Sequence, residues 1–363
     1  MVQLCLQTID NLLYSSKMLD KLYKRVDSIF TKINRVKLTK LEQQLYKLDK
    51  DPDFSSIFFS EFRDTHFCSR EIVSAMEREV KSITLYRFKY NNNVINLYVY
   101  ANEYPIENIL VKLTKCFILM ELTQIKDIER NIYFYPSTYK KELRLGYDLS
   151  PKNVNSGFTN FIGNIGSNIY IFREEDSDKV FLHECIHSLN LDFATSYSRD
   201  LDKFILANTL VNSNINLAES YTDLYAILIN SLVDSCYSKV DYREIIATEV
   251  LWQKKVVYHI LKHMGFSSLD QLFVRKDKEK DTLFRQSTSV FSYYIIKLVL
   301  FSNLEYFLSK YPIGLVWTVD KQWYYYEDIL KNIDMVKNIP LHSFKKDKYS
   351  TRMVYNKLKI NNC

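Results

Sequence analysis

The chain contains few of the residues that end helices and strands or that crosslink small folds. Glycine, proline and cysteine each occur six times in 363 residues. The cysteines form no CxxC pair and no dense cluster, which excludes a disulfide framework and is typical of reduced, mostly buried thiols. The first residues lack a basic segment followed by an apolar run, so we expect no secretory signal. Together these absences predict a cytoplasmic protein.

Long hydrophobic runs and a strong net charge are absent as well. The most apolar stretch, 290–308, is interrupted by Lys297, Asn303 and Glu305, so it predicts a core helix rather than a membrane span. The formal net charge of +6 is mild for this length and argues against nucleic acid as a partner. No feature of the sequence indicates an oligomeric state.

The composition that remains is that of a globular chain. Hydrophobic residues make up 47%, which is ample for a core and compatible with two packed lobes. Tyrosine occurs 28 times, and Asn, Lys and Ile are abundant. This skew is typical of an AT-rich genome and fits a large DNA virus or a parasite. For a virus, the compartment would be the host cytoplasm.

One motif carries recognisable chemistry. His183 and His187 are four residues apart, and Glu184 stands beside the first of them. On a helix, residues i and i+4 lie one turn apart on the same face, so the two imidazoles can hold one metal ion. A carboxylate next to this pair can act as a base on the water that the metal activates. HExxH strings also occur by chance, so a third ligand is needed to identify a zinc site.

Glu219 is the candidate third ligand, and Asp223 follows it by one helical turn. The surrounding residues are mostly apolar, and two carboxylates in a buried helix need partners because an unpaired buried charge is costly. A structural alternative is that Asn216 caps this helix and Glu219 completes a capping box, which leaves Asp223 unexplained. Asp192 and Asp200 are weaker substitutes for Glu219.

With HExxH followed by Glu219 and Asp223, the chain resembles the gluzincin class of zinc metallopeptidases over about 45 residues. The resemblance implies one Zn²⁺ per chain, bound by His183, His187 and Glu219. It also implies that Asp223 hydrogen-bonds a ligand histidine from behind, fixing its tautomer.

The same resemblance implies a reaction and excludes a neighbouring class. Glu184 would be the general base, and the substrate would be a peptide or a protein. The metzincin pattern requires glycine at position 190 and histidine at position 193, where this chain has Asn190 and Phe193.

The order of predicted elements favours an α+β fold. Leucines up to Leu48 recur at helical spacing and predict a helical N-terminal part. The elements predicted after it are an alternating hairpin over 83–100, a helix after Pro105, a strand at 131–135, a loop at 146–167 and a strand at 168–172. This is the order of a zincin upper lobe, so the resemblance implies a two-lobed zincin-like fold with a small mixed sheet. The predicted parts are a helical N-terminal extension (1–80), an upper lobe with the sheet and the HExxH helix (81–200), a mainly helical lower lobe with the third ligand (201–340) and a basic tail (341–363).

Substrate contacts are expected at two places. In zincins the last strand before the motif often lies at the cleft edge, where an extended peptide can add as another strand. The resemblance therefore places Ile169, Tyr170 and Ile171 against the substrate, with an ordinary core strand as the alternative. Arg285 could bind a substrate carboxylate.

Gluzincins commonly supply a tyrosine or histidine that hydrogen-bonds the oxyanion, and the candidates here are Tyr293, His259 and His263. On a helical wheel Tyr293 lies on a polar stripe with Arg285, whereas Tyr294 lies on the apolar side. Helix phase therefore favours Tyr293. The two histidines also fit the polar border of an amphipathic helix.

The sequence thus predicts a zinc metallopeptidase. The alternative is a non-catalytic zincin scaffold that binds a partner through its helical N-terminus and its basic tail, although such a protein has no chemical need for Glu184. A nucleic-acid binder is a third reading, which the mild charge disfavours.

Overall fold

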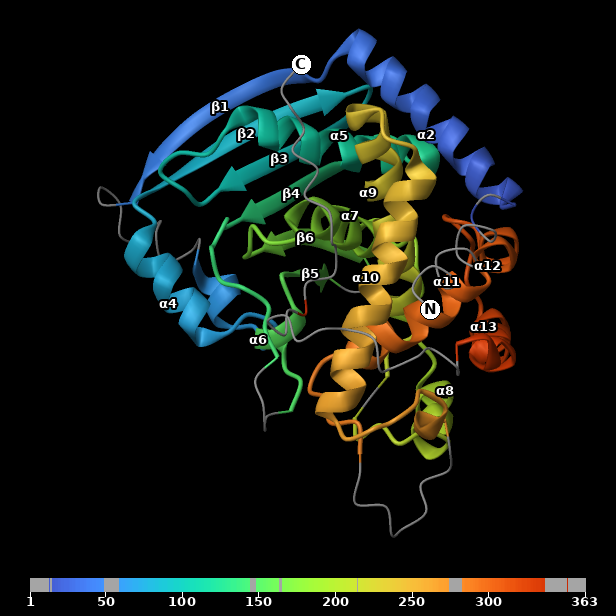
Figure 1. The fold of residues 1–363 in the computed structure, drawn as a ribbon. Coiled ribbons are helices and arrows are strands. Elements are labelled where there is room, and N and C mark those ends of the chain that lie inside the picture. Colours follow the sequence, from blue (N-terminus) through green and yellow to red (C-terminus); the bar gives the residue numbers. More distant parts are fainter. Residues whose placement is uncertain are drawn as a thin grey trace.

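The protein is described by a computed structural model at residues 13, 15–48, 59–143, 148–162, 165–213, 215–273, 283–336 and 351. These residues form an α+β fold, in which a mixed sheet lies on one side and most helices lie on the other (Figure 1). The predicted fold class is therefore confirmed. Among the described residues, none of the helices combines the length and the apolar character that a membrane span requires.

The sheet has six strands: β1 (Thr39–Lys47), β2 (Ser82–Tyr90), β3 (Asn93–Val99), β4 (Glu129–Phe134), β5 (Gly157–Ile162) and β6 (Ile165–Ile171). Their order across the sheet is β1-β2-β3-β4-β6-β5. Strands β3, β4 and β6 are parallel, β1 and β2 are antiparallel at one end, and β5 is antiparallel to β6 at the other. Strand β5 is thus the edge strand next to the helical half.

The β2–β3 hairpin follows the alternation of its sequence. Along β3, residues alternate between buried and half-buried positions, as expected for a strand with one face on the core. The turn between the strands places Asn91 at a φ of 51°, a left-handed conformation that asparagine tolerates better than most residues. The predicted hairpin is confirmed.

Two predictions about this region were wrong. Residues 39–47 form strand β1 rather than a continuation of the N-terminal helix, and all but one of them are exposed. Leucines at helical spacing misled the prediction here, because pairing with β2 rather than burial of these leucines holds the segment in place. The predicted loop at 146–167 contains a short helix, the whole of β5 and the start of β6.

The helices relevant to the site are α2 (Lys17–Val36), α4 (Arg70–Glu79), α5 (Ile106–Leu122), α6 (Pro151–Val154), α7 (Ser177–Ser188), α8 (Arg199–Ala207), α9 (Ala218–Ser238), α10 (Tyr242–His263), α11 (Lys297–Ser302), α12 (Leu304–Lys310) and α13 (Val319–Asn332). A π-helical segment, Phe291–Ile296, leads directly into α11. The expected helical region after residue 200 is confirmed, but the predicted helix at 290–308 is divided at Asn303.

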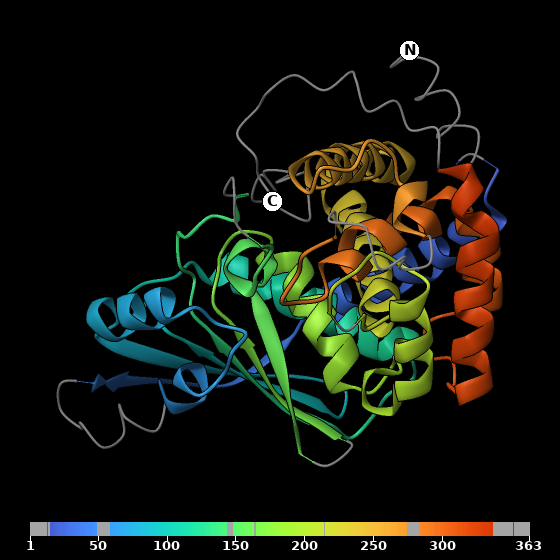
Figure 2. The same ribbon diagram turned by 90° about the horizontal axis from the view of Figure 1, so that it is seen from below.

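The main core lies between the sheet and these helices. Helices α5 and α7 pack against each other, α7 also contacts β5 and β6, and α9 packs against α7 (Figure 2). A smaller apolar cluster on the opposite face joins α4 to the sheet through residues such as Ile72, Met76 and Tyr100. The helix α7 is consequently buried over almost its whole length. In the predicted basic tail only Thr351 lies within the described residues, and the rest of that tail falls outside them.

Candidate metal centre

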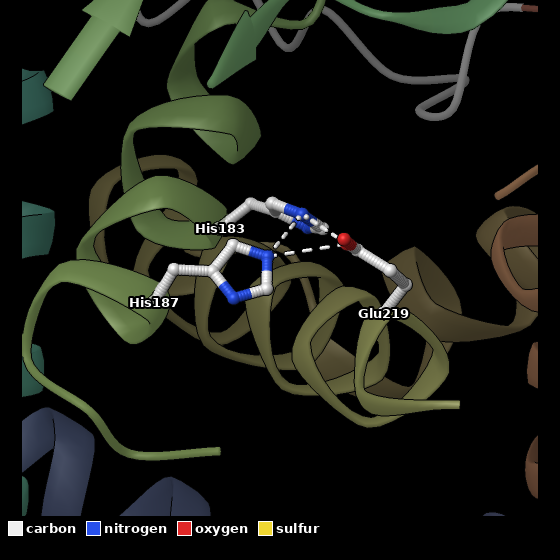
Figure 3. Close-up of side chains that lie close together, drawn as sticks. All are labelled: His183, His187 and Glu219. Carbon is white, nitrogen blue, oxygen red and sulfur yellow. Dashed lines mark hydrogen bonds and ion pairs between the residues drawn. The ribbon is translucent and has the colours of Figure 1, made fainter. Parts of the chain in front are cut away.

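The HExxH motif lies on α7, as the sequence predicts. His183 and His187 are one turn apart and point toward α9, where Glu219 stands in the first turn (Figure 3). The two histidines are about 5% exposed. The three residues are the one group of potential metal ligands found among the described residues.

The three side chains converge on one point. The Nε2 atoms of His183 and His187 are 3.1 Å apart, and each lies 3.1 Å from Oε2 of Glu219 (Figure 3). Three ligands at zinc distances of ~2.0–2.1 Å with tetrahedral angles would be about 3.3 Å from one another. The observed triangle therefore has nearly the size that a tetrahedral zinc ion requires.

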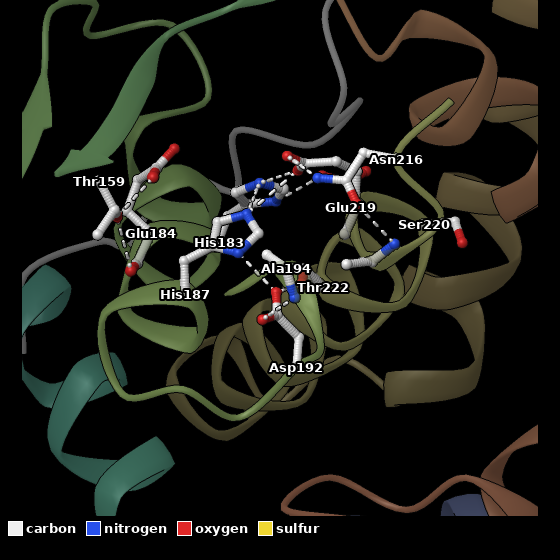
Figure 4. A network of polar contacts seen from close by, with 12 residues as sticks. Thr159, His183, Glu184, His187, Asp192, Ala194, Asn216, Glu219, Ser220 and Thr222 are labelled. Carbon is white, nitrogen blue, oxygen red and sulfur yellow. Dashed lines mark hydrogen bonds and ion pairs between the residues drawn. The ribbon is translucent and has the colours of Figure 1, made fainter. Parts of the chain in front are cut away.

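A carboxylate stands behind each imidazole. Oδ1 of Asp223 lies 3.1 Å from Nδ1 of His183, as the resemblance implied. Oδ2 of Asp192 lies 2.5 Å from Nδ1 of His187, and the same oxygen accepts a hydrogen bond from Thr222 (Figure 4). Asp192 is therefore not a substitute for Glu219 in this structure, because it lies on the far side of the imidazole.

This arrangement determines what the triangle can hold. With a proton on each Nδ1, facing a carboxylate, both Nε2 atoms present lone pairs to each other and to an oxygen of Glu219. Three acceptors at such short range repel one another unless a cation lies between them. The donor set thus fits Zn²⁺, which binds two imidazoles and a carboxylate in open catalytic sites.

Without a metal ion, the electrostatics of the protein shift the pKa values of the two histidines in opposite directions. Burial and the nearby Lys179 charge lower the pKa of His183 to about 3. Burial alone would lower the pKa of His187, but Asp192 and Glu219 outweigh it and raise that pKa well above its usual value. Burial opposes ionisation of Glu219, yet the two histidines hold its pKa well below the usual range. Glu219 is therefore a carboxylate, with the negative charge that a metal ligand needs.

Glu184 lies beside the triangle and not in it. Its carboxylate accepts a hydrogen bond of 2.9 Å from the hydroxyl group of Thr159 on β5 (Figure 4). Strand β5 approaches closely because Gly157 has no side chain: a Cβ atom there would lie 3.1 Å from Cγ of Glu184 and 2.9 Å from the carbonyl oxygen of Tyr170. Burial raises the pKa of Glu184 to about 7. A carboxyl group in this range can take up and return a proton near neutral pH.

Of the three residues expected to stabilise an oxyanion, only Tyr293 reaches this site. Its ring lies 5.9 Å from that of His183, centroid to centroid, and it lines the same small cavity as His183 and Glu184. Burial, with the charges of Glu219 and Glu184, raises the pKa of Tyr293 well above its usual value, so the hydroxyl group keeps its proton. Tyr294 points away and donates to the backbone carbonyl of Thr351.

Tyr293 belongs to the π-helical segment that precedes α11. Such segments are rare and often occur at functional sites, since the extra residue per turn displaces one side chain from the regular helical surface. Helix phase separated Tyr293 from Tyr294 correctly, although the segment is not the α-helix that the wheel assumed.

The remaining predicted residues lie elsewhere. His259 is buried on α10 and His263 is half-buried at its end, and neither lines the cavity. Arg285 is exposed and also outside the lining, so the polar stripe expected to carry it into a cavity does not do so. Asp200 is a surface residue paired with Lys203.

The expected substrate strand was assigned to the wrong place. Ile169, Tyr170 and Ile171 lie on β6, which pairs with β4 on one side and β5 on the other and so has no free edge. All three side chains are at most 2% exposed. The error followed from reading β5 as a loop, because β5 takes the edge position that the prediction gave to β6.

The capping alternative for Glu219 is realised only in part. The Asn216 side chain accepts a hydrogen bond from the Ala218 backbone and donates one of 3.4 Å to Oε1 of Glu219. Oε2 of Glu219 is the atom that faces both histidines. The Glu219 carboxylate therefore accepts a hydrogen bond from Asn216 with one oxygen and faces the two histidines with the other.

Sequence reasoning gave two lysines no role behind the histidines. Lys179 and Lys297 each form an ion pair with Asp223, and all three side chains are at most 1% exposed. Burial lowers the pKa of both lysines, that of Lys297 to about 7. One signal was available, since Lys179 precedes His183 by four residues and so lies on its helix face.

Comparison with known proteins indicates no activity. No protein-family profile matches the chain, and no solved structure matches it. It is 24% identical over 295 residues to "Uncharacterized protein R210" of Acanthamoeba polyphaga mimivirus, a match that covers 72% of this chain and 66% of that protein. Of the two sources that fitted the composition, a large DNA virus or a parasite, this similarity to a protein of a large DNA virus favours the first.

Proposed function

We propose that the protein is a zinc-dependent metallopeptidase of the gluzincin type. The observation that supports this most is the triangle of two Nε2 atoms and one carboxylate oxygen, each 3.1 Å from the other two. Asp192 and Asp223 behind the histidines support it further, because carboxylates in that position orient imidazole ligands and raise their basicity.

The residues around the triangle fit the parts of a hydrolytic reaction. When bound, the zinc ion supplies a Lewis acid that polarises the scissile carbonyl and acidifies a water molecule. Glu184 takes the proton of the attacking water and later passes it to the leaving amine, and the hydrogen bond from Thr159 holds it in place. Tyr293 donates its hydroxyl proton toward the carbonyl oxygen as negative charge develops there, a contribution typically worth ~3 kcal/mol.

Strand β5 is where an extended peptide substrate would lie. It is the edge strand of the sheet, and its residue Thr159 touches the proposed base. An extended peptide can pair with such an edge through its main chain, which explains how a site can accept different sequences. This assignment replaces the contacts first expected from β6. For a virus of this kind, the working compartment would be the host cytoplasm.

The decisive experiment pairs metal analysis with removal of the base. The purified protein should carry about one zinc per chain, and Glu219→Ala should lose most of it. Glu184→Gln should keep zinc and fold while cleavage of peptides falls by about 10³-fold or more. Asp200→Ala is the matched control, because this exposed carboxylate has no part in the site.

The non-catalytic alternative gives a different result. A zinc-loaded wild type that cleaves no member of a broad peptide pool, with Glu184→Gln equal to it in every biological assay, would establish a binding scaffold instead. Undiminished zinc in Glu219→Ala would assign the third ligand to another residue.

A further inference from the structure

Beside the triangle, between α7 and the start of β5, lies a small cavity with an unusual lining. This is the cavity that His183, Glu184 and Tyr293 line, and its wall also contains two fully buried lysines, Lys141 and Lys179, with Ser156 and Gly157. The free volume is ≈ 20 Å³. A single water needs ~10–15 Å³ on this measure, so the space has room for about one water or for one oxygen atom at the end of a polar group.

Lys141 has more donors than acceptors around it. Its side chain is completely buried, and within the described part of the chain its ammonium group makes one hydrogen bond, of 3.1 Å to Asp176. A lysine ammonium carries three N–H donors, and buried donors are nearly always paired. Burial lowers the pKa of Lys141, which is the expected response when counter-charge is insufficient.

Neighbouring groups show the same shortage of acceptors. The hydroxyl group of Ser156 is 3% exposed and has no hydrogen-bond partner among the described residues. Arg173 lies close enough to Lys141 for its charge to lower the pKa of that lysine. Its Nη2 atom donates a hydrogen bond to the backbone carbonyl of Lys152. Its buried Nε and Nη1 atoms have no hydrogen-bond partner in the described structure.

The acids of this region do not remove the shortage at the cavity itself. Asp176 pairs with Lys141 and Asp223 pairs with Lys179, but neither carboxylate is part of the cavity lining. Glu184 is the one acid in that lining, and its role as base requires it to face the water. The cavity wall thus carries two lysines and one acid.

We propose that this cavity is a subsite for a carboxylate of the substrate, held by Lys141 and Ser156 with Lys179 at its back. The inference rests on the proposed function, because it places an acidic group next to the bond that Glu184 and the metal would attack. Two sources carry this chemistry: the side chain of an Asp or Glu flanking the scissile bond, or the free C-terminal carboxylate of the peptide.

Two measurements test the subsite separately from catalysis. In the first, zinc-loaded protein is given pairs of peptides that differ only in Glu against Gln, each with a free or an amidated C-terminus. Wild type should favour one acidic member by about tenfold or more in kcat/KM, since a hydrogen bond to a charged group is stronger than one to a neutral group. Dependence on Glu identifies the side chain as the source, and loss of cleavage on amidation identifies the C-terminus.

The second measurement needs no turnover. The binding affinities of zinc-binding dipeptide hydroxamates are measured by calorimetric titration of the zinc-loaded protein. The hydroxamates are compared in the same two pairs, Glu against Gln and free acid against amide. The acidic member should bind about tenfold more tightly to wild type, and Lys141→Met should abolish this ratio. Lys140→Met is the matched control, because the adjacent Lys140 is 57% exposed and should leave the ratio unchanged.

The outcomes separate the two proposals. Cleavage without any preference for a carboxylate overturns the subsite and leaves the peptidase standing. No cleavage, but preferential binding of an acidic hydroxamate that Lys141→Met abolishes, supports the subsite and removes the peptidase. A preference that persists in Lys141→Met, or equal or absent binding of all the hydroxamates, overturns the subsite. Should Lys141→Met fail to fold, the wild-type comparison decides.

Discussion

Lys297 and Asp223 form an ion pair in which neither side chain is exposed to solvent. The second oxygen of Asp223 faces both Lys179 and Nδ1 of His183. A chain of contacts thus runs from α11 through α9 to the first histidine of the motif. The carboxylate that orients His183 is itself held from two sides.

From this relationship we predict that Lys297→Met weakens zinc binding by about tenfold. Partners behind a ligand histidine typically contribute 10–100-fold in metal affinity, and Lys297 acts one contact further away. Affinity is measured by competition with a chromophoric chelator, and circular dichroism verifies the fold. Lys331→Met is the control, since Lys331 is 69% exposed. An unchanged affinity in a folded Lys297→Met protein would show that Lys179 alone positions Asp223.

Tyr293→Phe should lower kcat by roughly 10²-fold with a modest change in KM, because the hydroxyl group acts mainly as charge develops on the carbonyl oxygen. Tyr294→Phe is the matched control. It loses a hydrogen bond of 2.5 Å to Thr351 and should cost about 1 kcal/mol of stability with kcat within a few-fold. Steady-state kinetics and urea denaturation of both variants provide the check. Equal kcat losses in the two would contradict the separation of their roles.

Gly157→Ala should destabilise the protein by about 1–3 kcal/mol, because the added methyl group overpacks the contact between β5 and α7. The new Cβ would lie 2.9 Å from a backbone oxygen, which cannot move as a side-chain end can. Thermal unfolding gives the magnitude. Zinc content should be retained, since none of the three ligands is touched. A wild-type melting temperature would mean that β5 can shift away from Glu184 without cost.

Lowering the pH should weaken the packing of α13, because it protonates the carboxylate of Asp328. Burial opposes ionisation of this carboxyl group, but hydrogen bonds from Lys310 and Tyr311 lower its pKa below the usual value. A depressed folded pKa stabilises the native state fully above the unfolded pKa of ~3.9 and loses that contribution as the pH falls through the folded pKa. The wild type should therefore be more stable than Asp328→Asn at pH 7, and the difference should shrink below about pH 4. Urea denaturation at several pH values measures it, and a difference independent of pH would contradict the assignment.

Local patterns in the sequence predicted the elements of the site that depend on helix periodicity. His183 and His187 share a face because they are four residues apart, and Glu219 and Asp223 do so for the same reason. Helix phase also distinguished Tyr293 from Tyr294. In each case one helix presents both residues, so spacing along the chain is enough.

What the sequence could not provide depends on contacts between distant segments. Asp192 was considered as a ligand, but only the turn after α7 determines that it lies behind His187. Strand β5 was read as a loop because its register depends on β6 and its approach to α7 depends on one glycine. Strand β1 was read as helical because exposed leucines at helical spacing resemble an amphipathic pattern, while its pairing partner lies beyond a long connection.

The corners of the histidine–glutamate triangle come from two helices, α7 and α9, that pack against each other. Helix α7 also packs on β5 and β6, and α9 also packs with α10 and α11. A metal ion bound by all three residues would add bonds between these two helices, so that moving one helix away from the other would also break a ligand bond. For the proposed peptidase, we therefore expect substrate to enter and leave through small displacements of surface segments and side chains while α7 and α9 keep their alignment.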